Sequence, residues 1–240
     1  MLSVDSFVAE SLALGLPRAC CWCDAPSPGE PACASCRARL PWNEHACRAC
    51  AIPLPAGAHT DVCKDCLEAS PSQDRTWAAF RYEPAIAAQV IGLKFHARFA
   101  PAHVLGTLMA LRLAQRPEPL PELLVPVPLQ ARRLWRRGYN QALEIARELS
   151  LHLRIVLAPQ LARRTGITQE QTRLSAAERR RNVRGVFEVS DNVRGRHIAI
   201  LDDVITTGAT AGELARTARQ AGARRIEVWA AARAELAHPR

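Results

Sequence analysis

The chain has 240 residues, 48% of them hydrophobic, and a formal net charge of +9. That length accommodates one α/β domain and a smaller domain, and the composition is typical of a globular protein. No apolar run approaches the roughly 18 residues of a membrane-spanning helix, so the sequence predicts no membrane span. No basic residue precedes Arg18. Because a secretory signal begins with positive charge, we expect a cytoplasmic protein.

Eight of the nine cysteines form four C-x-x-C pairs, all before residue 67. Two-residue spacing lets both thiolates of a pair bind one metal ion, and two pairs supply the tetrahedral Cys₄ set of structural zinc. We therefore expect two structural zinc ions, and both sequential and interleaved pairing stay open. Cys21 is expected to be a non-ligand neighbour, although it could replace Cys20. The predicted ligands are Cys20, Cys23, Cys33, Cys36, Cys47, Cys50, Cys63 and Cys66.

The cysteine-rich segment is predicted to form its own domain, residues 1–70, ahead of an α/β domain at 71–240. The segment is short and rich in Pro, Gly and Ala, so bound metal rather than a core should stabilise it. Disulfides are improbable in a cytoplasmic protein. Residues 69–74 are expected to be a polar linker.

The second domain is predicted to begin with a strand at 76–82 and two helices. Pro84 starts the first helix and Lys94 lies near its end, where its side chain could reach a bound ligand but is expected to be solvated. The second helix is expected over 97–116, with a disruption at Pro101, before three prolines end it. A short strand at 123–128, an arginine-rich turn and an amphipathic helix at 139–152 follow.

Basic charge is concentrated in the second domain. Residues 1–70 carry a net charge of −3 and the remainder +12. Between residues 125 and 184 there are 13 arginines, four glutamates and no aspartate. This pattern indicates either a solvated basic face or a surface for pyrophosphate, nucleic acid, or both.

The segment 198–210 has the composition of a phosphate site. Four apolar residues indicate a buried strand, two aspartates stand where it should end, and a helix is expected from about Thr210 to Gly222. Gly208 and its small neighbours let backbone N–H groups converge on a phosphate at the helix N-terminus. The carboxylates suit ribose hydroxyls, or Mg²⁺ held through water. These features together describe 5-phosphoribosyl-1-pyrophosphate (PRPP). A last strand is expected at 225–231, and the tail from Arg233 should be frayed.

The segment 198–210 resembles the PRPP-binding signature of type I phosphoribosyltransferases at all thirteen positions. The order V-P-V-P-L, arginine-rich turn and R-G-Y-N-Q resembles the ComF/GntX family of bacterial competence-type proteins. That family also has an N-terminal cysteine-rich zinc module. The resemblance implies a parallel sheet flanked by helices in a type I phosphoribosyltransferase-like domain, preceded by a double zinc ribbon.

The resemblance also implies roles for individual residues. Asp202 and Asp203 would hold the ribose and are the candidate catalytic residues, with Mg²⁺ accompanying PRPP. A loop with the pattern R-x-x-x-T-x-x-Q at 164–171 would lie over the ligand, followed by Leu174, Arg179 and Asn182. The 5′-phosphate would be bound by Thr206, Thr207, Gly208, Ala209 and Thr210. The candidates for binding pyrophosphate are Arg132, Arg136, Arg137, Arg163 and Arg164.

Two main functions follow from this resemblance. The first is handling of single-stranded DNA during natural transformation, with PRPP as ligand and a competence helicase as a partner. The second is an active phosphoribosyltransferase whose base or amine acceptor no residue identifies. A metabolic role of the GntX kind is a third, and the sequence does not predict an oligomeric state.

Overall fold

The computed structural model describes residues 19–69, 71–95, 99–166 and 183–235. The chain divides into two compact units, Met1–Leu40 and Pro41–Arg240. The first group of cysteines lies in the first unit, and the second group lies in the unit that contains the sheet. The domain boundary near residue 70 stays a prediction.

Both cysteine groups are built on the same local plan. In the first unit, an isolated bridge joins Ala19 to Pro26 and precedes helix α2 (Ala34–Arg39). In the second unit, an isolated bridge joins Ala46 to Pro53 and precedes helix α3 (Lys64–Glu68). In each case the bridge residue directly precedes the first cysteine of its group, so the two knuckles are a structural repeat.

The sheet of the second unit has five parallel strands in the order β1-β7-β6-β2-β3. Strands β6 and β7 are central and almost continuously buried, as expected for parallel strands covered on both faces. A separate antiparallel pair is formed by β4 and β5. The strands are β1 (Arg75–Arg81), β2 (Leu123–Pro126), β3 (Val156–Leu157), β4 (Ala162–Arg164), β5 (Phe187–Val189), β6 (His197–Ile205) and β7 (Arg225–Arg233).

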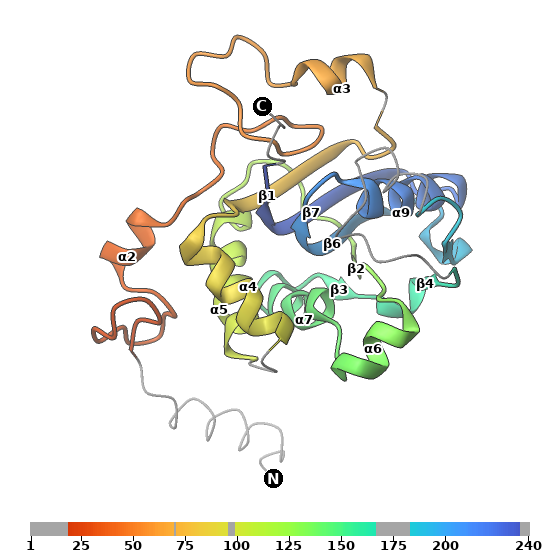
Figure 1. Cartoon of the computed structure of the whole chain (residues 1–240). Coiled ribbons are helices and arrows are strands. Elements are labelled where there is room, and N and C mark those ends of the chain that lie inside the picture. Colours follow the sequence, from red (N-terminus) through yellow and green to blue (C-terminus); the bar gives the residue numbers. More distant parts are fainter. Residues whose placement is uncertain (1–18, 70, 96–98, 167–182, 236–240) are drawn as a thin grey trace. The chain divides into compact units, whose positions relative to one another are not determined.

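Helices cover both faces of this sheet (Figure 1). One face packs against α4, α5 and α7, and the other packs against α9. The short helix α6 follows the carboxyl end of β2. The helices are α4 (Pro84–Phe95), α5 (Ala100–Leu113), α6 (Ala131–Arg137), α7 (Gln141–Leu153) and α9 (Ala209–Gln220), with 3₁₀ turns η1 (Pro159–Leu161) and η3 (Asp191–Val193). None of the helices in the described ranges combines the length and apolarity that crossing a bilayer demands.

The predicted fold class is confirmed over the described residues, with four local corrections. Pro101 lies in the first turn of α5, where proline is tolerated, and does not disrupt the helix. The arginine-rich turn is the helix α6. The strand before the phosphate segment continues to Ile205, so both aspartates lie within it. Arg233 ends β7 and is buried rather than frayed.

Candidate functional site

The turn between β6 and α9 has the geometry of an anion-binding loop. Gly208 caps α9 with a left-handed backbone (φ 74°), which favours glycine. The first helical hydrogen bond runs from Gly212 N–H to the Gly208 carbonyl over 2.8 Å. The N–H groups of Thr210 and Ala211 therefore have no carbonyl four residues back within the helix. With the positive end of the helix dipole they can bind a phosphate.

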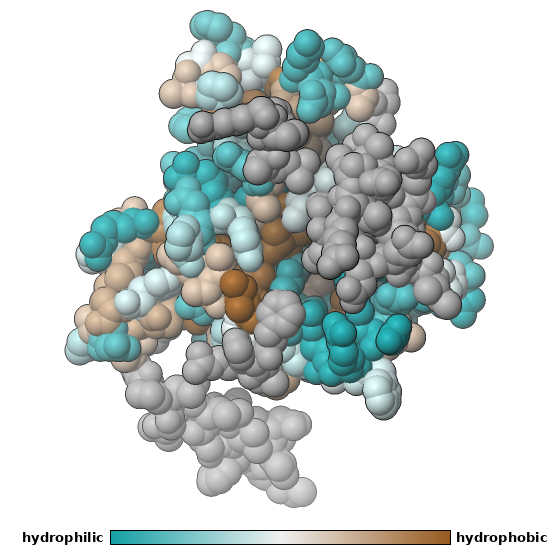
Figure 2. Space-filling view, in the orientation of Figure 1, coloured by the Kyte–Doolittle hydropathy of each residue, from teal (hydrophilic) through white to brown (hydrophobic). Residues whose placement is uncertain are grey.

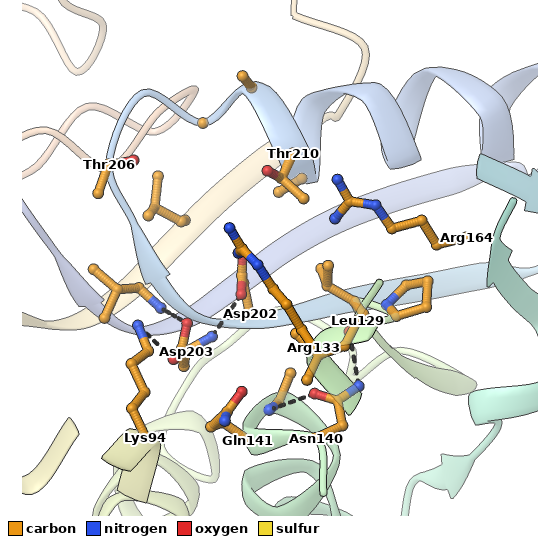
Figure 3. Close-up of a pocket in the computed structure, with 18 of the residues that line it drawn as sticks. Lys94, Leu129, Arg133, Asn140, Gln141, Arg164, Asp202, Asp203, Thr206 and Thr210 are labelled. Atoms are coloured by element: carbon orange, nitrogen blue, oxygen red, sulfur yellow. Dashed lines mark hydrogen bonds and ion pairs between the residues drawn. The ribbon is translucent and has the colours of Figure 1, made fainter. Parts of the chain in front are cut away.

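The two aspartates of β6 differ in their surroundings (Figure 3). Asp203 is 8% exposed, and its Oδ2 lies 2.7 Å from Nζ of Lys94 on α4. Its Oδ1 accepts a 2.8 Å hydrogen bond from Val204 N–H. Asp202 is only half-buried, lines the cleft, and accepts a 2.9 Å hydrogen bond from Asp203 N–H. Asp202 is therefore the carboxylate that a ligand can reach, and Asp203 is committed to Lys94.

Burial, and then the neighbouring charge of Asp203, raise the pKa of Asp202 to about 7, against an opposing contribution from Lys94. For Lys94, burial lowers the pKa, but the charge and hydrogen bond of Asp203 outweigh it and the pKa is raised. The cleft therefore holds one titratable carboxyl near neutrality beside a fixed ion pair.

The loop and the aspartates form one wall of a cleft of about 520 Å³, and arginines line the rest. Arg133, Arg136 and Arg137 come from α6, and Arg164 comes from β4. Figure 3 shows Arg133 and Arg164 pointing into the same space as Thr210. Burial and then the charge of Arg133 lower the pKa of Arg164. A polyanion bound here would relieve this crowding of positive charge.

The candidate residues divide into those that line the cleft and those that do not. Arg163 is on β4 with its side chain outside the lining, where Nη2 lies 2.5 Å from Oε2 of Glu188. Arg132 is exposed on α6 and is also outside the lining. Leu174, Arg179, Asn182 and the segment 168–171 lie outside the described residues. The candidates that line the cleft are Arg136, Arg137, Arg164, Asp202, Asp203, Thr206, Thr207, Gly208, Ala209 and Thr210.

Several cleft residues were not among the sequence candidates. Lys94 was expected to be solvated but is ion-paired inside the cleft. Asn140 donates from Nδ2 to the Val127 carbonyl (2.9 Å) and accepts from Ala142 N–H (3.0 Å). It therefore fixes the loop after β2 against the start of α7. The R-G-Y-N-Q motif carried this signal in its Asn, because asparagine is one of the preferred N-cap residues.

A buried arginine connects the anion loop to the second cysteine group. Arg233 is 5% exposed and donates from Nη1 to the carbonyls of Thr206, Ala234 and Ile205, the last at 3.2 Å. Its Nε donates to the Cys50 carbonyl over 2.9 Å. The position of the loop therefore depends on a side chain that also holds a cysteine knuckle.

The eight paired cysteines form two clusters by sequential pairing. In each cluster all four sulfurs lie within 4.8 Å of one another. A tetrahedral zinc ion with Zn–S bonds of about 2.3 Å separates its sulfurs by roughly 3.8 Å. The Cys23–Cys33 and Cys50–Cys63 Sγ–Sγ distances are both 3.7 Å. Both donor sets therefore fit structural zinc, and Cys21 belongs to neither.

Residues 11–67 match the family model of the double zinc ribbon domain. DNA utilization protein YhgH of Escherichia coli K12 is 34% identical over 202 residues, covering 82% of this chain and 88% of that protein. Competence protein F of Haemophilus influenzae is 36% identical over 179 residues, covering 72% of this chain and 78% of that protein.

Solved structures give weaker matches. The allosteric regulatory enzyme of purine biosynthesis is 20% identical, over 54% of this chain and 26% of that one, with a TM-score of 0.36. The hypoxanthine phosphoribosyltransferase of Trypanosoma cruzi is 14% identical, over 55% and 64% of the two chains, with a TM-score of 0.34. The extent and identity of the two curated matches, together with the zinc ribbon, are decisive: the chain belongs to the ComF/GntX family, with competence protein F and YhgH.

Proposed function

We propose that this protein binds PRPP in the cleft between α6 and the β6–α9 turn and handles single-stranded DNA during DNA uptake. The observation that carries the PRPP proposal is the meeting, in one cleft, of an anion loop, a reachable carboxylate and four arginines. Each matches one part of PRPP: the 5′-phosphate, the ribose diol and the pyrophosphate.

The assignment of parts follows from the chemistry of the residues that line the cleft. Thr206 to Thr210 would bind the 5′-phosphate through main-chain N–H groups and hydroxyls. Asp202 would accept hydrogen bonds from the ribose hydroxyls. Arg133, Arg136 and Arg164 would hold the pyrophosphate, a role for which planar guanidinium groups are suited. Arg133 replaces Arg132 and Arg163 in the sequence-based set, because it lines the cleft and they do not.

The residues fit Mg²⁺ only as a companion of the ligand. Asp203 is already bound to Lys94, so a single carboxylate, that of Asp202, is open to the cleft. Mg²⁺ retains several waters and is commonly bound through one or two carboxylates plus phosphate oxygens. Mg²⁺ would thus neutralise the pyrophosphate, and the chain would contribute Asp202 to its outer coordination.

The DNA role rests on the family relatives and on charge. The relatives are named for DNA utilization and for competence. In this chain the arginines of α6 supply the positive surface that a phosphate backbone requires. We place this role in the cytoplasm, where a reducing environment keeps Cys₄ zinc sites intact.

Two assays test the proposal. In a thermal-shift titration with Mg²⁺, PRPP should raise the melting temperature more than ribose 5-phosphate or pyrophosphate does, because only PRPP engages all three parts of the cleft. Equal shifts with all three ligands would contradict the assignment. A screen of bases and amines for pyrophosphate release should show no turnover, and turnover with one acceptor would establish a transferase instead.

A further inference from the structure

A tryptophan stands almost fully exposed on the arginine-rich helix. Trp135 is 89% exposed, and its neighbour Leu134 is 43% exposed. A tryptophan side chain usually buries 150–250 Å², so its ring in water is unusual in a folded unit. Of the large hydrophobic residues that the structure describes as exposed, Trp135 has the greatest exposed fraction.

The geometry of α6 separates the tryptophan from the cleft. Arg133 and Arg137 are four residues apart, share one face of the helix, and line the cleft. Trp135 lies about 200° from each of them around the helix axis, at 100° per residue. Its ring is therefore directed away from the cleft, where a PRPP molecule would not reach it.

An arginine lies beside the tryptophan on this outer surface. Arg132 is exposed and three residues before Trp135, and is therefore its neighbour along the helix. Residues 131–138 contain four arginines and no acidic residue. Figure 2 shows mainly hydrophilic side chains in the region of α6. Other arginines of this unit, such as Arg163 and Arg216, are paired with glutamates.

An aromatic ring beside an arginine, on a helix without acidic residues, matches single-stranded nucleic acid. Bases stack on aromatic side chains whatever their sequence, and arginines track the backbone phosphates. A duplex does not match as well, because stacking within it hides the faces of its bases. A protein partner fits less well too, because Leu134 and Trp135 are the only large apolar side chains of α6 that are exposed.

We propose that Trp135 is a stacking platform for a base of single-stranded DNA, with Arg132 binding the adjoining phosphate. The proposal rests on the DNA role proposed above and adds its contact residue. It also places the DNA strand on the outer face of the helix whose inner face lines the PRPP cleft. One helix then serves two ligands at once.

The test uses the full chain with its zinc and a fluorescein-labelled 20-nucleotide strand of mixed sequence, followed by fluorescence anisotropy. Trp135→Ala should weaken single-strand binding by roughly tenfold or more, as for other stacking residues, and leave the salt dependence unchanged. Trp135→Phe should retain most of the affinity. Arg132→Ala should reduce the salt slope by about 0.7. Leu151→Ala, which removes a 74% exposed side chain on α7, is the matched control and should bind as wild type.

Three further measurements test stacking on Trp135, the folding of the variants and the preference for single-stranded DNA. Single-stranded DNA should quench tryptophan fluorescence in the wild type, and this quenching should be lost in Trp135→Phe although binding persists. The PRPP-induced thermal shift should be the same in all four variants, which shows that they are folded. Wild type should bind the single strand more tightly than a duplex of the same sequence.

The stacking proposal is overturned if Trp135→Ala binds the strand as tightly as the control does, or if DNA still quenches tryptophan fluorescence in Trp135→Phe. A protein-docking role for Trp135 would give that same unchanged DNA affinity. If wild type binds no single-stranded DNA while PRPP still raises its melting temperature, the DNA role fails and the platform fails with it, but the PRPP site stands.

Discussion

Nζ of Lys94 lies 2.7 Å from Oδ2 of Asp203 and joins α4 to β6 inside the cleft. The pair is largely shielded, with side-chain exposures of 26% for Lys94 and 11% for Asp203. This ion pair occupies the Asp203 carboxylate, so Asp202 is the carboxylate of the pair that a ligand can reach. The two adjacent acids therefore differ in role: Asp203 is ion-paired with Lys94, and Asp202 is the carboxylate that we propose binds ligand.

Removal of Lys94 should destabilise the fold. Lys94→Met leaves the Asp203 carboxylate buried without its counter-charge, which should lower the free energy of unfolding by about 2 kcal/mol, between the values for exposed and buried pairs. Urea unfolding followed by circular dichroism measures this change. Lys64→Met on α3 is the control, since Lys64 is exposed, and should change stability little. An equal effect of both substitutions would show that the Lys94–Asp203 pair contributes nothing.

Asp202 should make stability and ligand binding respond to pH in opposite directions. Its folded-state pKa of about 7 lies above the ordinary 3.8, so the folded state retains a proton that the unfolded state loses. The stability contributed by that proton falls as pH rises from about 4 to 7. Asp202→Asn should therefore melt higher than wild type at pH 8, by a margin that shrinks toward pH 4.

The same substitution should remove the pH dependence of ligand binding. In the wild type, affinity for PRPP with Mg²⁺ should increase from pH 6 to pH 8 as Asp202 ionises. Asp202→Asn should bind more weakly and retain only the part of the profile due to the phosphates of the ligand. Calorimetry at several pH values compares the two profiles. Parallel profiles would mean that the titrating group is not Asp202.

Arg233 should control ligand affinity without touching ligand. Its guanidinium holds the carbonyls of Thr206 and Cys50, and lysine, with one nitrogen, cannot reach both groups. Arg233→Lys should weaken PRPP binding by roughly tenfold, in line with the loss of hydrogen bonds from a charged donor. Zinc content should stay unchanged. Arg219→Lys is the control, because Arg219 also donates to main-chain carbonyls but outside the cleft lining.

The two zinc sites should differ in their effect on the sheet. Thr76 Oγ1 donates to the Ala49 carbonyl over 2.8 Å, and Thr76 N–H donates to the Arg48 carbonyl over 2.7 Å, so β1 is held by the second knuckle. Cys47→Ser with Cys50→Ser should lower both the melting temperature and PRPP affinity. Cys20→Ser with Cys23→Ser should remove one zinc ion per chain and leave both properties of the sheet unit unchanged. Zinc analysis and thermal shifts with PRPP measure the two effects.

Gly208 and Gly212 allow a matched comparison within one helix. Gly208 has a positive φ of 74°, where alanine is strained by roughly 1 kcal/mol. Gly212 lies inside α9, and a Cβ there meets nothing within 4 Å. Gly208→Ala should lower the melting temperature and weaken PRPP binding. Gly212→Ala should raise the melting temperature, because alanine is the better helix former. The reverse order would contradict the assigned loop geometry.

The sequence predicted the parts of the fold that local pattern determines. The C-x-x-C spacing indicated two Cys₄ sets, and apolar runs indicated β6 and β7. The C-x-x-C spacing left the pairing of the cysteines open, because it is the same in all four pairs. The extension of β6 to Ile205 follows from its pairing with Arg233 of β7, which the local sequence does not encode. The solvated role expected for Lys94 was wrong because its partner, Asp203, lies 109 positions further along the chain.

The arginines of the cleft show the same limit of prediction from sequence. Composition indicated a basic surface, but only the helical periodicity of α6 places Arg133 and Arg137 in the cleft and Trp135 outside it. The expected turn would not have separated these faces. The anchoring role of Arg233 was missed because an arginine at the last position of a strand carries no local signal of burial.

Calorimetric titration of the zinc-loaded chain with PRPP and Mg²⁺ tests most directly the proposal that the β6–α9 loop and Asp202 bind PRPP. We predict saturable binding of one PRPP per chain, competition by ribose 5-phosphate, and loss of binding in the double variant Asp202→Asn with Asp203→Asn. Normal zinc content in that variant would show that its first and second knuckles are intact. Absence of saturable heat in the wild type, or an unchanged titration in the double variant, would contradict the account.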